Sequence, residues 1–330
     1  MVMSQSLYIY LQQQHPGIVI DVLAPAWSEP ILARMPEVNR TIVAPLAHGE
    51  LGLAKRRQLG RELREQHYDQ AILLPNSLKS SLIPFFAKIP LRTGWRGEMR
   101  YGLLNDLRRL DESVFPLMVE RFVSLGQVAG MPLPAVIPPP FLTVDPVMAE
   151  ACRDKFGLDS AKPILALCPG AEFGSAKCWP VEYYGQIARE YLDKGWQIVL
   201  YGSANDVAVT ESISLACSQA PLCFNLAGKT ELAEAVDLLS LSAAVLSNDS
   251  GLMHIASALG RPLLVVYGPT STNFTPPLSD RAESIIPKLD CAPCFQRECP
   301  LGHHRCMRDT TVELVSERLD ALLLSTGSRS

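Results

Sequence analysis

The sequence predicts an α/β protein made of two doubly wound domains, each with a parallel β-sheet covered by helices on both faces. Three observations lead to this expectation. At 330 residues the chain is too long for one typical hydrophobic core. Segments typical of strands and of helices alternate along it, which favours parallel sheets. Five prolines crowd residues 131–140, and we interpret that stretch as the linker between the domains.

The first domain is expected at residues 1–140. Its predicted helices are at residues 4–14, 51–66 and 77–87, and its predicted strands at 18–24 and 68–74. Met1 leads almost directly into a helix, whereas a doubly wound domain normally opens with a strand. The pattern therefore indicates that the first strand is missing; the alternative is a fold that simply begins with a helix.

The second domain is expected at residues 141–310, facing the first across a cleft. Its predicted strands are at residues 164–168, 197–201, 243–247 and 262–267, and its predicted helices at 181–194, 211–219, 232–241 and 252–259. A final helix at residues 312–324, within the C-terminal segment 311–330, is expected to pack back across the first domain.

The amino-acid composition and net charge exclude some classes of protein. With 48% hydrophobic and 19% charged residues, the chain has ample apolar material for two cores. Its net charge of −4 argues against a general nucleic-acid binder. Without a long apolar run or a signal-like start, we expect a cytoplasmic protein. Nine irregularly spaced cysteines favour reduced thiols over a disulfide framework.

A polar turn between a predicted strand and helix is the strongest functional signal. Asp249 or Ser250 can cap the helix, and Gly251 lets another group approach the backbone. The exposed N–H groups at the helix start suit a phosphate, so this turn predicts a nucleotide site. His254 lies one helical turn further on. The alternatives are an ordinary capped helix and a histidine that belongs to the core.

A second loop follows the strand at residues 164–168. Gly170 and Gly174 expose backbone donors, and Lys177 adds a mobile positive charge near the end of the strand, where ligands bind in such sheets. The loop matches neither the P-loop nor the G-x-G-x-x-G pattern, and a solvated lysine is the alternative. After the next strand, a polar side chain such as Ser203 or Asn205 can reach a ribose. Asn205 or Asp206 can equally cap a helix, which is the better interpretation for Asp206.

Four cysteines near the C-terminus could supply enough thiolate ligands for zinc or an iron–sulfur cluster. They are Cys291, Cys294, Cys299 and Cys306. Because their spacing fits no standard template, we favour reduced thiols that shape a loop, and we expect no metal.

Basic residues of the first domain suggest two binding surfaces. Arginines and aromatic side chains interleave in residues 92–109, which suits an anionic, sugar-like acceptor; a solvated, salt-bridged face is the alternative. A second cluster on a predicted helix is compatible with an anionic membrane surface: Lys55, Arg56, Arg57, Arg61 and Arg64.

Taken together, these segments resemble the bacterial ADP-heptose:lipopolysaccharide heptosyltransferases of glycosyltransferase family 9. The likeness runs nearly from end to end and is carried by MSQSLY, DVLAPAW, RMPEVN, LPNSLKS, RTGWRGEMRYGLLND, CPGAEFGSAKCWP, NDSGLMHIASALGRP, YGPTS and FTPPLS. It implies a GT-B fold of two Rossmann-like domains, with the acceptor bound by the N-terminal one and the donor by the C-terminal one. It also implies a metal-independent, inverting transfer of L-glycero-D-manno-heptose from ADP-heptose to the first heptose of the lipopolysaccharide inner core, heptosyl-Kdo2-lipid A.

The resemblance also assigns roles to residues. It places Lys177 and Asp249 among the catalytic residues, and it implies no cofactor, no nucleic-acid partner and peripheral contact with the inner membrane. Its donor-binding set is Gly170, Ala171, Lys177, Ser203, Asn205, Thr230, Asp249, Ser250, Gly251 and His254. Its acceptor-binding set is Asn76, Lys79, Arg96 and Arg100.

The sequence departs from the family in a few places. Glu172 and Phe173 replace two threonines found in one branch, so backbone groups there would have to bind the phosphates. The family's strand and Gly-Asp loop, which carries the expected general-base aspartate, would precede the residue matching Met1. A misplaced start, or a non-catalytic protein that binds ADP-sugar or lipopolysaccharide, are the two resulting hypotheses. A nicotinamide-dependent oxidoreductase is a third, disfavoured by the lack of G-x-G-x-x-G.

Overall fold

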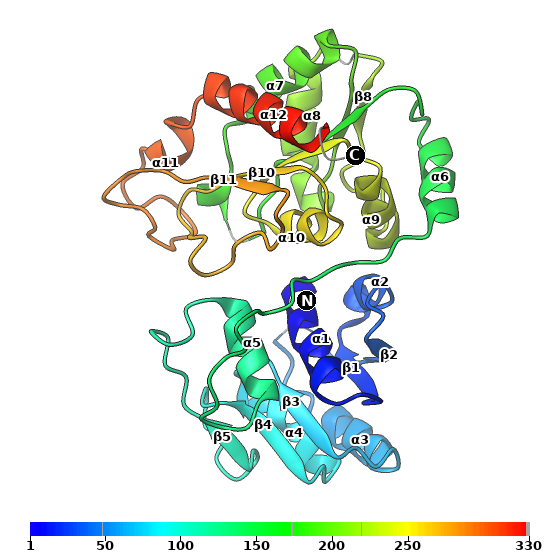
Figure 1. The fold of residues 1–330 in the computed structure, drawn as a ribbon, viewed down its shortest axis with the longest axis vertical. Coiled ribbons are helices and arrows are strands. Elements are labelled where there is room, and N and C mark those ends of the chain that lie inside the picture. Colours follow the sequence, from blue (N-terminus) through cyan, green and yellow to red (C-terminus); the bar gives the residue numbers. More distant parts are fainter. Residues whose placement is uncertain (48, 173, 219, 328–330) are drawn as a thin grey trace. The chain divides into compact units, whose positions relative to one another are not determined.

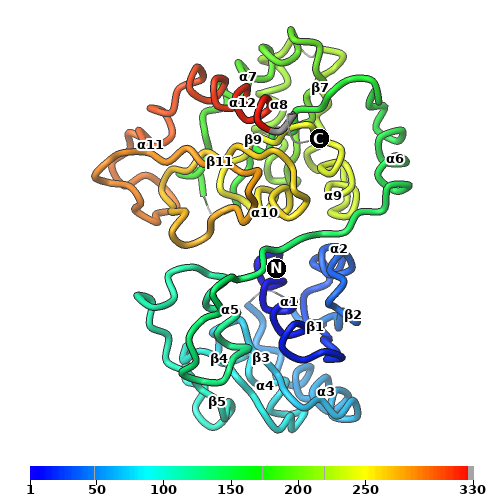
Figure 2. Tube along the Cα trace, in the orientation of Figure 1, coloured from blue at the N-terminus to red at the C-terminus, as the bar shows by residue number. Residues whose placement is uncertain are grey.

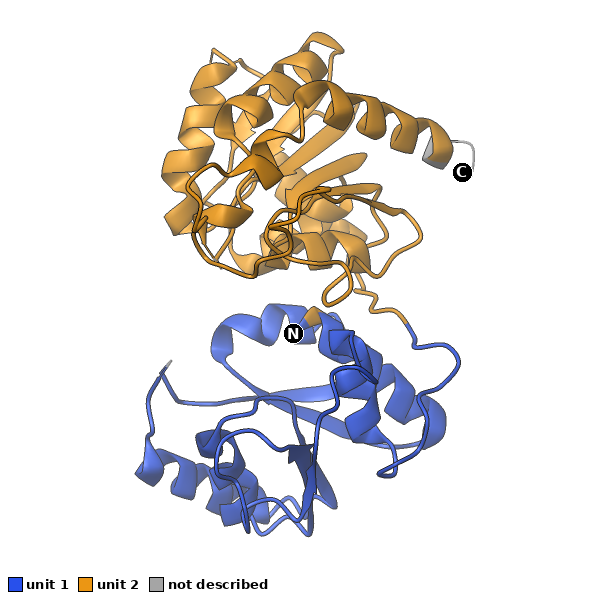
Figure 3. Ribbon diagram, turned by 90° about the vertical axis from the view of Figure 1, so that its left-hand side faces the viewer, with its two compact units in different colours: residues 1, 3–138 blue, residues 2, 139–330 orange. Residues whose placement is uncertain are grey.

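The computed structural model describes residues 1–47, 49–172, 174–218 and 220–327. The chain divides into two compact units, coloured separately in Figure 3. Unit 1 comprises residues 1 and 3–138, and unit 2 comprises residues 2 and 139–330. The boundary falls inside the proline-rich stretch that we interpreted as a linker.

Unit 1 is an α/β structure whose strands are all parallel (Figure 1). Its strands are β1 (Ile20–Ala24), β2 (Val38–Val43), β3 (Gln70–Leu73), β4 (Leu91–Trp95) and β5 (Asp106–Arg108). Its α-helices are α1 (Gln5–Gln14), α2 (Glu29–Leu32), α3 (Leu53–Arg64), α4 (Leu78–Phe86) and α5 (Met118–Gly126), with 3-10 turns η1 (Val2–Ser4) and η2 (Ala26–Ser28).

Backbone hydrogen bonds divide the strands of unit 1 into two sheets. In the described residues, β1 pairs with β2, while β3, β4 and β5 form a second sheet in that order. In each of β1 and β3 one residue is buried and the others are partly buried or exposed. Helices α3 and α4 pack closely enough for Gly60 to lie against Phe86. The small core beside them contains Leu59, Leu63, Ile83, Ala87 and Ile89.

Unit 2 contains one larger parallel sheet in the order β11-β10-β9-β6-β7-β8. These strands are β6 (Ile164–Cys168), β7 (Gln197–Leu200), β8 (Cys223–Asn225), β9 (Ala244–Asn248), β10 (Leu263–Val266) and β11 (Ala282–Ile285). The α-helices are α6 (Pro146–Lys155), α7 (Val181–Asp193), α8 (Val207–Ala216), α9 (Leu232–Ser240), α10 (Gly251–Ala258), α11 (Arg305–Arg308) and α12 (Val312–Gly327), with 3-10 turns η3 (Ser175–Lys177) and η4 (Ala204–Asp206).

The central strands of unit 2 are mostly apolar because helices cover both faces of their sheet. Every residue of β6, β7, β9 and β10 is buried. Along the chain β6 is followed by β7 on one side, whereas β9 lies on its other side. The strand order therefore reverses between β6 and β9, and that is where such sheets bind ligands.

The last helix packs into the core of unit 2, where Val315 and Leu319 are buried. Its expected packing across the first domain stays a prediction. Asp320 accepts a hydrogen bond from Tyr191 Oη at 2.8 Å and binds Lys194 Nζ at 3.0 Å. Figure 2 shows the red α12 beside α7. Its apolar stripe is therefore part of the second core.

Some boundaries also differ from the prediction. The helix expected at residues 211–219 starts earlier, because Ser203 and Asp206 form a capping box that opens η4 and α8 continues directly from it. Residue 219 lies outside the described residues. Within the described ranges, no helix combines the length and the apolar character needed to cross a membrane.

Candidate functional site

The candidate site lies at the carboxyl edge of the sheet in unit 2, where β6 and β9 run side by side. Cys168 and Ser247 are paired near the ends of these strands. Because both strands are parallel, the loop that follows β6 and the turn that follows β9 emerge at the same edge. The structure thus brings together two segments that lie 72 residues apart in the sequence.

The turn after β9 starts α10 as predicted. Ser250 is the N-cap, and its hydroxyl accepts a hydrogen bond from the Met253 backbone N–H at 3.4 Å. The interpretation of Ser250 as a helix cap is therefore confirmed. A side chain at Gly251 would meet nothing within 4 Å, so the backbone there is open to a ligand. The cap and a phosphate site are compatible, since capping leaves other N–H groups of the first turn available.

An ion pair joins the two segments. Lys177 Nζ lies 2.7 Å from Asp249 Oδ2, and Thr270 Oγ1 donates to the same oxygen at 2.7 Å. The side chains of Lys177 and Asp249 are only 13% and 6% exposed. The alternative of a solvated loop lysine is therefore wrong. A partly buried pair of this kind places a positive group, already oriented, beside the helix start.

The loop that carries Lys177 is held by a distant segment. Gly174 has a φ of +155°, and a Cβ there would lie 2.3 Å from the Arg297 carbonyl oxygen. The same oxygen accepts a hydrogen bond from the Ala176 N–H at 3.1 Å. Sequence reasoning missed both Arg297 and Thr270, because only the tertiary fold brings them to the site. Phe173, in the same loop, lies outside the described residues.

His254 is half-buried on α10, one turn beyond Ser250. Burial lowers the pKa of its imidazole to about 4; the Asp249 carboxylate opposes this shift, and Lys177 adds to it. The ring is therefore neutral near pH 7. It can offer a hydrogen bond to a ligand but no positive charge.

The remaining predicted donor residues lie along the same edge of the sheet. Gly170 and Ala171 follow β6, Ser203 and Asn205 follow β7, and Thr230 follows β8. Asp206 accepts hydrogen bonds from the backbone N–H and the hydroxyl of Ser203, both at 2.8 Å. It is thus the N3 residue of a capping box whose N-cap is Ser203, and its side chain makes no capping bond to α8. Its carboxylate also lies against Gly170, where a Cβ would come within 2.4 Å of it. Asn205 is exposed, so its role as a ribose ligand stays a prediction.

The cysteine loop is a structural neighbour of the site. Cys291, Cys294, Cys299 and Cys306 are all free and half-buried. Over the described ranges, no three side chains of the metal-ligating types are grouped to hold an ion. Backbone N–H groups of residues 301–304 lower the pKa of the Cys299 thiol. The loop docks on the site through the Phe295 N–H, which donates to the Pro269 carbonyl at 2.8 Å.

The predicted acceptor residues lie in unit 1 at the carboxyl ends of β3 and β4. Asn76 and Arg96 are exposed and follow these two adjacent strands, and Lys79 lies in the first turn of α4. The Arg96 guanidinium carbon lies 5.8 Å from the centre of the Tyr101 ring. A Cβ at Gly97 would come within 2.2 Å of the Asn76 carbonyl oxygen, so the two loops are in close contact.

Arg100 differs from the other acceptor residues because its side chain is fully buried. Its guanidinium donates to the Pro75 carbonyl at 2.7 Å, to the Asn76 side-chain oxygen at 3.4 Å and to the Trp95 carbonyl. These bonds tie the loop after β3 to the loop after β4. The structure thus gives Arg100 a supporting role, and direct contact with an acceptor stays a prediction.

The basic residues on and beside α3 fall into two groups, those that bind other parts of the protein and those that are exposed. Arg56 is buried and donates to the backbone carbonyls of Leu51, Lys79 and Glu50. Arg64 donates to the Phe86 carbonyl at 2.6 Å, and Lys55 pairs with Glu50 at 2.9 Å. Arg57 and Arg61 are exposed. The surface that α3 presents is therefore smaller than the sequence cluster suggested.

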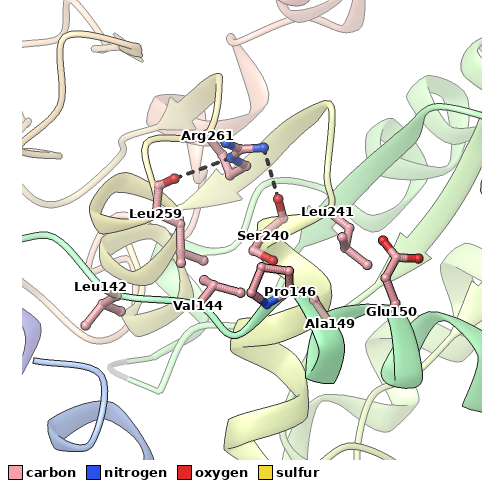
Figure 4. A pocket seen from close by; sticks show the side chains of 9 residues that line it. All are labelled: Leu142, Val144, Pro146, Ala149, Glu150, Ser240, Leu241, Leu259 and Arg261. Carbon is pink, nitrogen blue, oxygen red and sulfur yellow. Dashed lines mark hydrogen bonds between the residues drawn. The ribbon is translucent and has the colours of Figure 1, made fainter.

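A pocket of about 300 Å³ lies elsewhere in unit 2 (Figure 4). Its lining includes Leu142, Leu259 and Arg261, and the Arg261 guanidinium donates to the Ser240 carbonyl at 2.9 Å. Ser240 precedes β9 and Leu259 follows α10, so the pocket lies at the opposite end of these elements from Lys177 and Asp249. It is separate from the candidate site.

Comparison with known proteins gives consistent results. Residues 56–305 match the sequence profile of glycosyltransferase family 9 (heptosyltransferase). The chain is 49% identical to lipopolysaccharide heptosyltransferase 2 of Escherichia coli K12, over 98% of this chain and 95% of that protein. It is 48% identical to lipooligosaccharide heptosyltransferase 2 of Haemophilus influenzae, over 98% and 96% of the two chains.

Solved structures agree in fold. The structure of ADP-heptose lps heptosyltransferase II from E. coli superposes with a TM-score of 0.90 at 47% identity, over 99% of this chain and 96% of that one. A family 9 glycosyl transferase from Veillonella parvula shares the fold alone, with a TM-score of 0.86 at 18% identity over 98% and 94% of the two chains. On these grounds the chain belongs to glycosyltransferase family 9, the heptosyltransferases.

Proposed function

We propose that this chain transfers L-glycero-D-manno-heptose from ADP-heptose to the first heptose of the lipopolysaccharide inner core. The observation that carries the proposal is the Lys177–Asp249 ion pair beside the start of α10, at the point where the strand order of the sheet reverses. The near full-length similarity to lipopolysaccharide heptosyltransferase 2 supports the same substrates.

The donor diphosphate is proposed to lie between Lys177 and the first turn of α10. An ammonium group has three N–H donors, so Lys177 can hold Asp249 and a phosphate oxygen at the same time. The backbone N–H groups after Ser250 and the positive end of the helix add to the attraction. Asp249, oriented in turn by Thr270, keeps the lysine at the carboxyl edge of the sheet.

The chemistry proposed is a single displacement with inversion. The acceptor hydroxyl oxygen attacks the anomeric carbon of the donor heptose, the bond from that carbon to the diphosphate oxygen breaks, ADP leaves with the electron pair, and the hydroxyl proton passes to solvent water. Negative charge grows on the diphosphate, so Lys177 and the α10 N–H groups stabilise the transition state more than the ground state. His254, uncharged near pH 7, would contribute a hydrogen bond.

The acceptor is proposed to bind unit 1 through Asn76, Lys79 and Arg96. An inner core carries carboxylate and phosphate groups, which suit an exposed guanidinium and an ammonium group. The bonds from Arg100 to Pro75, Asn76 and Trp95 would keep this surface in shape.

Contact with the cytoplasmic face of the inner membrane is part of the proposal, because the acceptor is a lipid. Leu51 and Leu53 are 56% and 52% exposed at the start of α3, and Arg57 and Arg61 are exposed on the same helix. Apolar side chains next to cations suit the interface of an anionic membrane. Sedimentation with vesicles containing anionic lipid tests this: replacing Leu51 and Leu53 with serine should reduce binding, and unchanged binding would contradict it.

The main experiment is a transfer assay with ADP-heptose and two acceptors, heptosyl-Kdo2-lipid A and Kdo2-lipid A. We expect heptose incorporation into the first acceptor and not into the second. Incorporation into neither, with ADP-heptose still bound, would favour a non-catalytic binding protein. Failure to bind ADP-heptose at all would overturn the proposed function.

A further inference from the structure

Asn248, the last residue of β9, has a fully buried side chain that makes hydrogen bonds on both sides of its amide. Its Oδ1 accepts from the Trp179 backbone N–H at 3.1 Å and from Tyr184 Oη at 3.0 Å. Its Nδ2 donates to the Pro169 carbonyl at 2.5 Å. Burial raises the pKa of the Tyr184 phenol, so that group remains an O–H donor at neutral pH.

These partners lie at the two ends of one loop. Pro169 directly follows β6, and Trp179 comes just before α7, whose first turn holds Tyr184. The segment between Pro169 and Trp179 carries Lys177. Asn248 therefore bridges the two ends of the lysine loop, while its neighbour Asp249 binds the lysine itself.

The chemistry of this position is specific to an amide of this length. The asparagine amide presents an acceptor and a donor on one small planar group that does not titrate, and the Trp179 N–H and the Pro169 carbonyl require both together. An aspartate keeps the shape but turns a second acceptor toward the Pro169 carbonyl. An alanine leaves the buried N–H and carbonyl without this partner, which is costly in a protein interior.

We infer that Asn248 is a positioning residue for Lys177: it holds the two ends of the lysine loop, Pro169 and Trp179, so that the ammonium group meets the donor diphosphate. The inference rests on the proposed function, because it assigns Lys177 to the diphosphate. Asn248 itself touches no substrate in this scheme.

The test compares ADP affinity by titration calorimetry in Asn248→Asp, Asn248→Ala and Tyr184→Phe. Tyr184→Phe removes one O–H donor from Asn248 and is the milder change, so it keeps the test valid if the Asn248 variants fold poorly. Asn225→Ala is the matched control. Asn225 is also the last residue of its strand, β8, and its side chain caps a local turn through the Ala227 N–H at 3.2 Å.

Each variant is measured at a temperature where its circular dichroism matches that of the natural chain. We expect ADP binding to weaken about tenfold or more in Asn248→Asp and Asn248→Ala, as expected when one charge-assisted hydrogen bond is misplaced, and by a smaller factor in Tyr184→Phe. Asn225→Ala should bind ADP normally. If the folded Asn248 variants and Tyr184→Phe all bind ADP as tightly as the control, the inference is overturned.

A double-mutant cycle separates positioning from a merely structural role. In a Lys177→Ala background, Asn248→Asp should weaken ADP binding no further, because the group that it positions is absent. If the loss of ADP affinity in the double variant equals the product of the losses in the two single variants, the inference is overturned. If Lys177→Ala alone leaves ADP affinity unchanged, the proposed donor site fails; if Lys177→Ala weakens binding and the Asn248 variants do not, only the role of Asn248 fails.

Discussion

Lys177 Nζ lies 2.7 Å from Asp249 Oδ2, although 72 residues separate the two in the sequence. The pair forms where the loop after β6 meets the turn after β9, and both side chains are largely shielded from water. An ammonium group held in this way needs little further ordering when a diphosphate binds, so its electrostatic effect is available at the moment of reaction.

Replacing Lys177 with alanine should lower kcat by about 100-fold, because the charge that develops on the departing diphosphate loses its partner. Steady-state kinetics with saturating acceptor measure this. Lys288→Ala, which removes an exposed lysine from the same unit, is the control and should retain full activity. An unchanged kcat in Lys177→Ala would remove the lysine from the proposed role.

Thr270→Val should impair the site more mildly. The change keeps the shape of the side chain and deletes the hydroxyl that donates to Asp249 Oδ2 at 2.7 Å. A hydrogen bond to a charged group is worth about 1.5–3 kcal/mol, so we expect a loss of that order in the free energy of unfolding, together with weaker ADP binding. Urea denaturation and calorimetry measure the two effects. If Thr270→Val matches the control Thr272→Val in both, Thr270 does not support the ion pair.

The pKa of His254 predicts how stability depends on pH. Its folded-state pKa is lowered to about 4, below the value of about 6.5 for a histidine in an unfolded chain. The unfolded state therefore binds the proton first, and this residue makes the folded state progressively less stable as the pH falls from about 6.5 toward 4. Above about pH 6.5, His254 is neutral in both the folded and the unfolded state, and its titration does not change the free energy of unfolding.

His254→Gln should therefore flatten the loss of stability between pH 7 and pH 5, because glutamine does not titrate. Urea midpoints at several pH values measure the slope, with the exposed His15→Gln as control. A slope as steep in His254→Gln as in His15→Gln would show that other groups cause the acid sensitivity.

Arg96→Gln should raise KM for the lipopolysaccharide acceptor about tenfold, the effect of losing one charge-assisted contact, and leave ADP affinity unchanged. Arg109→Gln, another exposed arginine of unit 1, should change neither quantity. Acceptor kinetics at two salt concentrations check the electrostatic cause, since screening should weaken the Arg96 contribution. A rise in ADP dissociation constant instead would place Arg96 in donor binding.

Leu319→Ala should destabilise the chain by about 2–5 kcal/mol, because Leu319 is fully buried where α12 packs into the core of unit 2. Leu324→Ala on the same helix removes a side chain that is 76% exposed and should change stability by no more than about 0.5 kcal/mol. Urea unfolding of the two variants compares them directly. Equal stability would mean that α12 does not contribute to this core.

The sequence predicted the elements whose signal is local. The runs at residues 164–168 and 262–267 are continuously apolar because helices cover both faces of their sheet, and both are strands. β2 was missed because several of its side chains are exposed, which leaves no apolar pattern. β8 was missed because it has only three residues and is defined by its pairing with β7.

Part of the candidate site could also be predicted, because some of its residues have a local sequence signal. The cap at Ser250 and the strand-end position of Lys177 follow from local patterns. Arg96 and Arg100 look alike in the sequence, yet the Arg100 guanidinium is buried among acceptor oxygens of Pro75, Asn76 and Trp95, which only the tertiary fold brings together. Thr270 and Arg297 reach the site only through the tertiary fold, so no local pattern marks them.

The most direct test of the central claim is a crystal structure of the chain with ADP-heptose bound. We predict diphosphate oxygens within hydrogen-bonding distance of Lys177 Nζ and of backbone N–H groups in the first turn of α10. A well-defined nucleotide bound away from the carboxyl ends of β6 and β9, with the Lys177–Asp249 pair untouched, would contradict the account.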